Sequence, residues 1–333
     1  MRAIVVEEFG STDVLKVKEV PAPTLAPNHV RVDVKASGLN FADIMTRLGH
    51  YAHAATLPYI GGTEVCGVVT EVAPGVGRIA VGDRVAGMMH SGGFAEQVCI
   101  DHRDVIVIPD SMSFIEGAAV PVAYATSWAG MIGYGSLRQG ERVLIKAAAG
   151  AVGVAAVQLA KNVGAEVWGA ASPGKHEAIR AIGVDTTLDY TQPGWDNDLP
   201  SFDVIMDAIG GDSFHRSYNL LRPGGRLIAY GAVSAFSGGV REVTEGQPDD
   251  FRVITGLSAA NLIVDSRTLI GLDLRVLWDD RGTLQPWLSP LEPLMASKAV
   301  APVVSAVVAF DDVATAHQML TDRRNIGKVV IVP

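Results

Sequence analysis

Between residues 142 and 233 short apolar segments alternate with amphipathic ones, and this alternation constrains the fold more than any other feature of the chain. The expected strands cover residues 142–147, 165–171, 186–190, 202–210 and 226–233, and the expected helices cover residues 152–164, 173–183 and 213–225. Alternation at this spacing produces right-handed strand–helix–strand units and a parallel sheet. Because the strands are almost wholly apolar, we expect helices on both faces of that sheet. The sequence therefore predicts an α/β fold with a doubly wound parallel sheet.

The first of these units contains the segment "AAAGAVGVAAVQLAK" at residues 147–161. It resembles the dinucleotide fingerprint G-x-G-x-x-G, with Ala148 at the first position, followed by Gly150 and Gly153. The alternative is a helix that packs closely through small residues. Because a strand precedes the segment and a helix follows it, we favour a cofactor loop that includes Ala151 and Val152. Gly150 would let a pyrophosphate approach the helix N-terminus, and Gly153 would let the helix pack against the strand.

The end of the next expected strand indicates which dinucleotide binds. NAD sites usually carry Asp or Glu there to bind the ribose hydroxyls, whereas this chain has Ser172 and Lys175. A hydroxyl and an ammonium can bind a 2′-phosphate that a carboxylate would repel. Tyr190 could add a phenolic hydrogen bond. The alternative is an ordinary solvated loop, and His176 fits a surface residue better than a ligand. We predict NADPH.

The N-terminal third has a different pattern, of short β-rich segments separated by Gly and Pro, from residue 2 to about residue 108. It predicts a compact barrel or sandwich, with one helix inside residues 38–51 and a helical stretch over residues 113–135. A final strand over residues 327–333 looks like a return to this first domain. A chain of 333 residues exceeds one ordinary core. We therefore predict a β-rich domain over 1–123 and 298–333 and a nucleotide-binding domain over 124–297.

Composition excludes several classes of function. The formal net charge is −9 and Lys and Arg do not cluster, which argues against nucleic acid as a partner. The sequence contains no apolar run of about eighteen residues, so we expect no membrane span. The start lacks the pattern of a secretory signal, and two distant cysteines, Cys66 and Cys99, give no disulfide framework. We expect a cytoplasmic protein.

The order of motifs resembles the medium-chain dehydrogenase/reductase superfamily from end to end. It is carried by "GLNFAD", "GTEVCGVV", "GDRV", "IPDSMSFIEGAAVPVAYAT", "AAAGAVGVAAVQLA" and "GKVVIV". "LNFADIMTRLG", "GVDTTLDY" and "RRNIGKVVIVP" are similar to its zinc-independent quinone oxidoreductase branch, although Ala151 replaces a glycine of that branch. The resemblance implies a GroES-like catalytic domain and a Rossmann domain, with NADPH in the cleft between them.

Zinc-dependent members of the superfamily bind catalytic zinc at positions where this chain has Asn40 and Thr63. Neither side chain is a usual zinc ligand, so we predict no metal. Reduction must then rely on positioning and hydrogen bonds. The resemblance places Asn40 and Tyr51 on the substrate side of the cleft and Thr126 near the nicotinamide. The alternatives are a helix cap for Asn40 and a packed aromatic residue for Tyr51, and Asp43 fits a helix-turn carboxylate better than a general base.

Further cofactor contacts follow from the same resemblance. Ile209 and Gly231 end strands at the carboxyl edge of the sheet, where ligands bind in open α/β folds. Asn325 matches a position that contacts cofactor in the branch, although an ordinary turn would also explain it. Residues 238–271 could form a lid, and residues 268–277 read as an apolar edge strand, through which the family implies a homodimer.

These features favour an NADPH-dependent, zinc-free reductase that transfers hydride to a small-molecule quinone or conjugated enone. A quinone needs little help as a hydride acceptor, because aromaticity stabilises its product oxyanion. The first alternative is an enoyl-thioester reductase, since the loop segment also resembles polyketide enoyl reductase domains; there Tyr51 would donate to the enolate. An alternative of another class is a non-catalytic NADPH-binding module.

Overall fold

The computed structural model describes residues 1–51, 53, 55–231 and 258–333 of the chain. Contacts divide these residues into two compact units. The first comprises Met1–Ala125 with Arg275–Pro333, and the second comprises Thr126–Leu274. Residues 275–297, which the sequence assigned to the nucleotide-binding domain, therefore make their contacts in the first unit.

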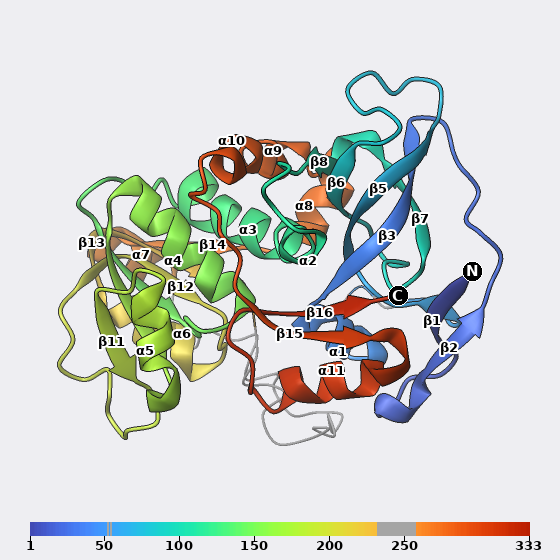
Figure 1. Ribbon diagram of the computed structural model, residues 1–333. Coiled ribbons are helices and arrows are strands. Elements are labelled where there is room, and N and C mark those ends of the chain that lie inside the picture. The colour runs from blue at the N-terminus through green and yellow to red at the C-terminus, as the bar shows by residue number, and fades with distance from the viewer. Residues whose placement is uncertain (52, 54, 232–257) are drawn as a thin grey trace. The chain divides into compact units, whose positions relative to one another are not determined.

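The second unit is built on a six-stranded parallel sheet with the order β11-β10-β9-β12-β13-β14 (Figure 1). In chain order this is 3-2-1-4-5-6, the arrangement of the Rossmann fold. The α/β class and the parallel sheet predicted from the alternating pattern are confirmed. The strands are β9 (Arg142–Lys146), β10 (Glu166–Ala171), β11 (Thr186–Asp189), β12 (Phe202–Asp207), β13 (Leu221–Ala229) and β14 (Thr268–Gly271).

Helix α4 (Ala151–Val163) connects β9 to β10 and packs on both. It begins after Gly150 and ends at Gly164, whose φ of 89° provides the left-handed termination that glycine adopts without strain. Its buried residues include Val154, Val157 and Leu159. The other helices of this unit are η3 (Trp128–Tyr134), η4 (Pro173–Lys175), α5 (His176–Ala181), α6 (Asp212–Asn219) and α7 (Ala259–Asp265), while α3 (Pro121–Ser127) crosses the boundary between the units.

One expectation for this region was wrong, and a second was correct in type but too coarse. The helix predicted over residues 213–225 ends at Asn219, and residues 221–225 already belong to β13. Leu221 pairs with Phe202 of β12, and Pro223 could not continue a helix because it lacks an N–H donor. The helical stretch predicted over residues 113–135 is divided into α2 (Phe114–Gly117), α3 and η3.

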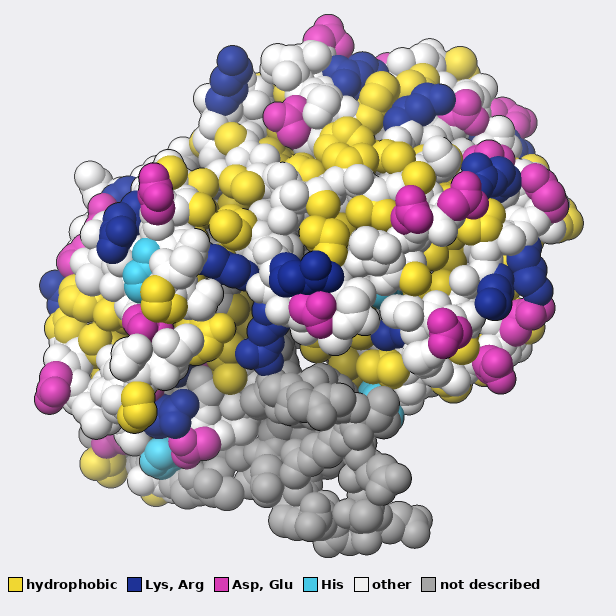
Figure 2. All heavy atoms as spheres, turned by 60° about the horizontal axis from the view of Figure 1, so that its bottom comes forward, with side chains coloured by type: hydrophobic (Ala, Val, Ile, Leu, Met, Phe, Trp, Pro, Cys, Tyr) yellow, Lys and Arg dark blue, Asp and Glu magenta, His cyan; other side chains and the backbone are white. Residues whose placement is uncertain are grey.

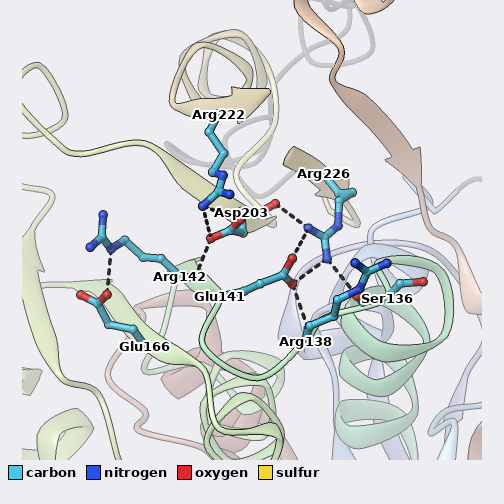
Figure 3. Close-up of polar contacts among 8 residues, drawn as sticks. All are labelled: Ser136, Arg138, Glu141, Arg142, Glu166, Asp203, Arg222 and Arg226. Atoms are coloured by element: carbon cyan, nitrogen blue, oxygen red, sulfur yellow. Dashed lines mark hydrogen bonds and ion pairs between the residues drawn. The ribbon is translucent and has the colours of Figure 1, made fainter. Parts of the chain in front are cut away.

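The amino ends of these strands carry a network of ion pairs (Figure 3). Arg226 of β13 donates to both carboxylate oxygens of Glu141, at 2.9 and 2.8 Å, and also to the carbonyl oxygens of Gly135 and Ser136. Burial alone would raise the pKa of Glu141, but the hydrogen bonds from Arg226 and from the Arg138 N–H, together with the charges of both arginines, lower that pKa. Charged side chains thus tie β13 to the segment before β9 at the edge opposite to the predicted cofactor loop.

The first unit contains a seven-stranded sheet and a three-stranded sheet. The larger one runs β15-β16-β3-β5-β6-β8, with β7 also paired to β3, and the smaller one runs β2-β1-β4. Strand β16 pairs antiparallel with β3, which confirms the predicted return of the C-terminus to the first unit. The strands are β1 (Arg2–Val6), β2 (Leu15–Glu19), β3 (His29–Leu39), β4 (Tyr59–Ile60), β5 (Glu64–Val72), β6 (Arg84–Met88), β7 (Gln97–Asp101), β8 (Val105–Val107), β15 (Val304–Ala309) and β16 (Lys328–Val332).

Two apolar clusters fill this unit. One joins Val32, Val65 and Val98 of the larger sheet, and the other joins Ile4, Phe94 and residues of α11. Besides α2, the helices are η1 (Thr12–Val14), α1 (Phe41–Arg47), η2 (His102–Asp104), α8 (Leu274–Arg281), α9 (Gln285–Leu288), α10 (Leu291–Ala296), η6 (Phe310–Asp312) and α11 (Val313–Thr321).

The predicted edge strand over residues 268–277 is correct only for its first part. β14 lies at the edge of the parallel sheet but ends at Gly271, and α8 begins at Leu274. Trp278 of α8 is buried and donates from its indole N–H to Asp104 at 3.0 Å. Helical spacing brings Leu274 and Trp278 to the same face of α8, so both can be buried, which a strand continuing outward would not achieve.

Candidate active site

In the second unit the carboxyl ends of the parallel strands bring most of the predicted cofactor residues to one edge. Lys146 at the end of β9 is level with Ala170 of β10, and Ala171 is level with Asp189 of β11. Because the strands are parallel, the segments that follow them emerge at the same edge of the sheet. The predicted residues on these segments are Gly150, Ala151, Val152, Gly153, Ser172, Lys175, Tyr190, Ile209 and Gly231.

Of the two loop glycines, Gly150 and Gly153, only Gly153 is required by the packing of the protein itself. A Cβ on Gly153 would lie 2.3 Å from the carbonyl oxygen of Ala147 and 2.7 Å from the carbonyl carbon of Ala148, so only glycine fits there. A Cβ on Gly150 would meet only the Ala147 oxygen, at an ordinary 3.4 Å, and φ of Gly150 is −74°. Neither conformation nor packing demands glycine at position 150. Gly150 is the N-cap residue of α4, and its role as a cofactor contact stays a prediction.

The first fingerprint position needs no glycine, because the left-handed residue of the loop is Ala147, with φ of 57°, and not Ala148. Ala148 is fully buried, and its Cβ would lie 3.0 Å from a Cβ placed on Gly169 of β10. A methyl group therefore fills the space where the fingerprint has its first glycine.

The residues expected at the 2′-phosphate follow β10. Ser172 precedes η4, and its carbonyl oxygen accepts a hydrogen bond from the backbone N–H of Lys175 at 2.9 Å. Both side chains are half-buried, whereas Tyr190 is 41% exposed. The ring of His176 contacts the carbonyl oxygen of Ala171 through Nε2 at 3.0 Å. The loop places a hydroxyl and an ammonium beside the end of β10, and no carboxylate lies between residues 170 and 176.

A buried charge cluster at the same edge was missed by sequence reasoning. Lys146 is 2% exposed, and its Nζ donates to the Ser213 hydroxyl at 2.8 Å and lies 3.4 Å from Asp207 Oδ2. Asp207 is fully buried and accepts hydrogen bonds from the hydroxyls of Ser213 and Ser217 and from the Ile209 N–H. Burial lowers the pKa of Lys146, against the opposing effect of Asp207.

This Lys146–Asp207 cluster joins the ends of β9 and β12, the point where the strand order reverses. It also fixes the backbone of Ile209, one of the predicted cofactor residues. The sequence feature that could have revealed this cluster is the charged residue that ends each of two largely apolar strands, "RVLIK" and "FDVIMD".

In the first unit Asn40 belongs to a second buried network. Its amide nitrogen donates to Glu64 at 2.8 Å and to the Thr63 hydroxyl at 3.2 Å, and its oxygen accepts from Lys328 Nζ at 2.6 Å. Lys328 and Glu64 form an ion pair, and neither is more than 1% exposed. The other Glu64 oxygen accepts from the backbone N–H of Val122. Asn40 therefore also occupies the helix-cap position foreseen as its alternative, before α1.

Asp43 accepts a hydrogen bond from the backbone N–H of Asn40 at 2.8 Å, as a helix-turn carboxylate does. Burial raises the pKa of Asp43 to about 7, because the hydrogen bond from Asn40 and the charge of Lys328 only partly offset the loss of water. The rings of Tyr51 and His53 are 5.5 Å apart, edge to face. Asn325 is buried and donates from its side chain to the Gly327 carbonyl, the turn foreseen as its alternative.

The structure therefore groups the predicted residues by unit. Asn40, Tyr51 and Asn325 lie in the first unit, and Thr126, half-buried near the end of α3, lies in the second with the sheet-edge residues. Their roles stay predictions. The lid expected over residues 238–271 falls largely on residues 232–257, which lie outside the described part of the chain.

Within the described ranges no group of three or more His, Cys, Asp or Glu side chains could hold a metal ion, and the absence of a metal requirement stays a prediction. No helix in those ranges is long and apolar enough to cross a bilayer. On the face shown in Figure 2 acidic and basic side chains are interspersed.

Comparison with known proteins agrees with this architecture. Residues 26–110 match the family model of the alcohol dehydrogenase GroES-like domain, and residues 182–331 match that of the zinc-binding dehydrogenase domain. The mouse synaptic vesicle membrane protein VAT-1 homolog is 33% identical over 341 residues, which cover 100% of this chain and 84% of that protein. The NorB protein of the spectinabilin polyketide synthase system of Streptomyces orinoci is 43% identical over 229 residues, 67% of this chain and 10% of NorB.

Among solved structures, the quinone oxidoreductase from Thermus thermophilus, also solved in complex with NADPH, aligns with a TM-score of 0.81 and 30% identity over the whole of both chains. A GroES-like β-rich unit and a Rossmann sheet in one chain define a dehydrogenase-type oxidoreductase. The chain belongs to the medium-chain dehydrogenase/reductase superfamily, in its zinc-independent, quinone oxidoreductase-like branch. The family and fold predicted from the motifs are confirmed.

Proposed function

We propose that the protein is an NADPH-dependent, metal-independent reductase that transfers hydride to a quinone or a conjugated enone. The observation that carries the proposal is the sheet edge of the second unit. There Gly150 leaves open space at the start of α4, and Ser172 and Lys175 follow β10 where NAD-binding proteins have an acid. The NADPH complex of the Thermus thermophilus relative supports the choice of cofactor.

The residues of this edge fit the parts of NADPH in a consistent way. The start of α4 offers backbone N–H groups that have no partner within the helix, and its dipole favours the pyrophosphate. Ser172 and Lys175 would bind the 2′-phosphate, with Tyr190 beside them. Ile209, whose backbone the Lys146–Asp207 cluster holds, and Gly231 would line the nicotinamide end, and Asn325 would add a contact from the first unit. When bound, NADPH supplies the hydride.

Protein groups would position the acceptor and stabilise the charge that develops on its oxygen. Asn40 is held by Glu64 and Lys328 and donates its longer hydrogen bond, 3.2 Å, to Thr63. Exchanging that bond for one to an acceptor oxygen would leave the bonds to the buried ion pair intact. Tyr51 and Thr126 are the other proposed contacts, and solvent can supply the protons that a reduced quinone takes up.

A second candidate function is enoyl-thioester reduction, favoured by the 43% identity to the polyketide synthase system protein. In that reaction Tyr51 would protonate the enolate. A third candidate, binding of NADPH without turnover, differs from both because no acceptor would be consumed. We further propose that the protein is cytoplasmic, acts on a small molecule without nucleic acid or membrane as partner, and forms a homodimer.

The test follows NADPH oxidation by its near-ultraviolet absorbance, with an ortho-quinone and a crotonyl thioester in parallel, with and without a chelator, and with NADH as control. We expect quinone turnover that survives the chelator and is reduced at least tenfold in Asn40→Ala. Lys175→Ala should raise KM for NADPH about tenfold through loss of one charged hydrogen bond and leave KM for NADH unchanged. Lys161→Ala, which removes a surface lysine of the same unit, is the matched control.

Turnover of the thioester alone, lost in Tyr51→Phe, would replace the quinone proposal by the second candidate. Tight NADPH binding without turnover of either acceptor would favour the binding module. Equal KM values for NADPH and NADH in the unmodified protein would overturn the proposed role of Ser172 and Lys175.

A further inference from the structure

A separate cavity lies inside the first unit. Its inner volume is about 20 Å³, and the volume rises to about 320 Å³ when the space open to solvent is included. Its walls come from β1, the start of β2, α1, the segments around residues 59–63 and 90–94, and α11. The polar and charged side chains among them are Asp43, Thr46, Arg47, Tyr59, Thr63, His90, Ser91 and His317.

Arg47, the last residue of α1, faces this cavity with a guanidinium that is only 5% exposed. Its Nε and Nη1 atoms are fully buried and have no hydrogen-bond partner among the described residues. No carboxylate in the described ranges lies within ion-pair distance of Arg47. A buried cation without a counter-charge is unfavourable, and burial accordingly lowers the pKa of Arg47, although arginine stays charged at neutral pH.

His317 of α11 lines the same cavity and is 1% exposed. Neither of its ring nitrogens has a hydrogen-bond partner among the described residues. Its ring packs edge to face with Phe94, with centroids 6.4 Å apart. Burial, together with the charge of Arg47, lowers the pKa of His317 to about 3, so the ring is neutral and offers one N–H donor.

No other titratable group on the walls forms an ion pair with Arg47 among the described residues. Asp43 is engaged by the N–H of Asn40, and burial raises its pKa to about 7, so that it is only partly ionised at neutral pH. Burial also raises the pKa of Tyr59, which therefore stays neutral. His90 lies at the exposed side, 3.3 Å from Asp279, and burial lowers its pKa. In the described part of the chain the cavity thus presents one positive charge that has no ion-pair partner and one additional neutral donor.

We propose that this cavity binds a small monocarboxylate, or an anion of the same planar shape, with the Arg47 guanidinium as its main contact and the His317 N–H as its second donor. The planar fork of arginine matches a carboxylate, and a negative charge would compensate the buried cation. The limited room selects a group of about the size of formate. That group is either a free anion or the carboxylate end of a longer molecule that extends through the mouth.

The site lies entirely in the first unit and does not depend on the proposed reductase function. It is nevertheless close to the Asn40 network, because Thr63 and Asp43 line the cavity and each contacts Asn40. Failure of the anion site would therefore leave the reductase proposal standing, and failure of the reductase proposal would leave the anion site standing.

The experiment titrates ¹³C-labelled sodium formate into the purified full chain in a buffer low in other small anions and follows the formate line width by NMR. We expect saturable broadening with the unmodified protein and with Arg281→Met, which removes an exposed arginine of the same unit. Arg47→Met should weaken the binding of formate at least tenfold, and His317→Phe should weaken this binding by a smaller factor. Benzoate in place of formate separates the two sources, since only the end of a longer molecule would tolerate the ring.

Thermal unfolding of Arg47→Met without formate shows whether the variant folds. Because the substitution removes an unpaired buried charge, its melting temperature should not fall below that of the unmodified protein. Absence of saturable broadening with the unmodified protein, or unchanged broadening in folded Arg47→Met, would overturn the proposal and leave a cavity filled by water alone.

Discussion

At the scale of single residues, the two glycines at the start of α4 differ in how much room their surroundings leave for a side chain. Gly153 is required by its own surroundings, since a Cβ would lie 2.3 Å from the Ala147 oxygen, whereas a Cβ at Gly150 would have room. Packing therefore accounts for Gly153, and the proposed pyrophosphate contact would account for Gly150.

We predict that Gly150→Ala and Gly153→Ala have different consequences. Gly153→Ala forces the loop backbone to move and should lower the free energy of unfolding by about 1–3 kcal/mol. Gly150→Ala should change it by less than about 1 kcal/mol, because φ is already compatible with alanine, but should weaken NADPH at least tenfold. Urea unfolding and fluorescence titration with NADPH measure the two effects. Unchanged NADPH affinity in Gly150→Ala would contradict a pyrophosphate at this position.

Asp43 makes the stability of the protein depend on pH in a predictable direction. Its folded pKa of about 7 lies above the unfolded value near 3.9, so the folded state binds more protons between those values. Stability from this group is therefore complete below about pH 4 and is lost as the pH rises through 7, by at most about 1.4 kcal/mol per pH unit. Asp43→Asn should make the free energy of unfolding less dependent on pH between pH 5 and 7.5.

Glu64, Lys328 and Thr63 surround Asp43 and remain in place in this variant. Asp13→Asn, which removes an exposed carboxylate of the same unit, serves as the control and should keep the original pH dependence. An equally steep decline in Asp43→Asn would assign the effect to another group.

At the scale of elements, the Lys146–Asp207 cluster connects two strands at the reversal of the sheet. Asp207 also accepts hydrogen bonds from α6 through Ser213 and Ser217, so one carboxylate holds β9, β12 and a helix together. β9 and β12 are each followed by a segment of the proposed cofactor edge, and α6 begins directly after one of these segments.

Substituting either Lys146 or Asp207 should lower the free energy of unfolding, and the loss should be larger for Asp207. Asp207→Ala leaves the Lys146 ammonium buried without a counter-ion and should lower the free energy of unfolding by about 3–5 kcal/mol. Lys146→Met leaves Asp207 with three hydrogen-bond donors and should cost about 1–3 kcal/mol. Urea unfolding followed by circular dichroism measures both.

The control is Lys161→Met, which breaks a 2.9 Å pair with Asp185 that is 38–41% exposed, and should cost less than about 1 kcal/mol. Equal losses in Asp207→Ala and Lys161→Met would show that burial does not govern the strength of this pair.

At the scale of the whole molecule, two features bear on the assembly of subunits: the sheet edge at β14 and the exposed apolar residues of α7. β14 is the edge of the parallel sheet, and α7 just before it exposes Ile263 by 77% and Val264 by 82%. An apolar surface beside an open sheet edge is typical of a subunit interface.

We expect the protein to sediment as a dimer at micromolar concentration. Val264→Lys should shift it toward the monomer, because the substitution places a charge within the apolar interface. Val81→Lys, at an apolar residue of the first unit that is 64% exposed, should leave the dimer unchanged. A monomer at all concentrations of the unmodified protein would contradict assembly through β14 and α7.

The sequence by itself determined the parallel sheet, the loop before α4 and the return of the last strand. These features depend on periodicity and on glycine spacing, which act over fewer than twenty residues and are visible in a linear chain. It also identified the family, because the same motifs occur in a fixed order. It was wrong where a local pattern competes with a distant partner, as in residues 221–225, which pair with β12 and do not continue a helix.

Only the tertiary structure decided which polar and charged side chains contact each other. Asn40 and Lys328 are 288 positions apart, and Lys146 and Ser213 are 67 positions apart, yet each pair shares a hydrogen bond. Arg47 and His317 line one cavity from two helices at opposite ends of the chain. The order and register of strands place these side chains, and a linear pattern does not specify strand order. Arg47, His317 and Lys328 are therefore buried because the fold places them where water cannot reach, which no local pattern in the sequence indicates.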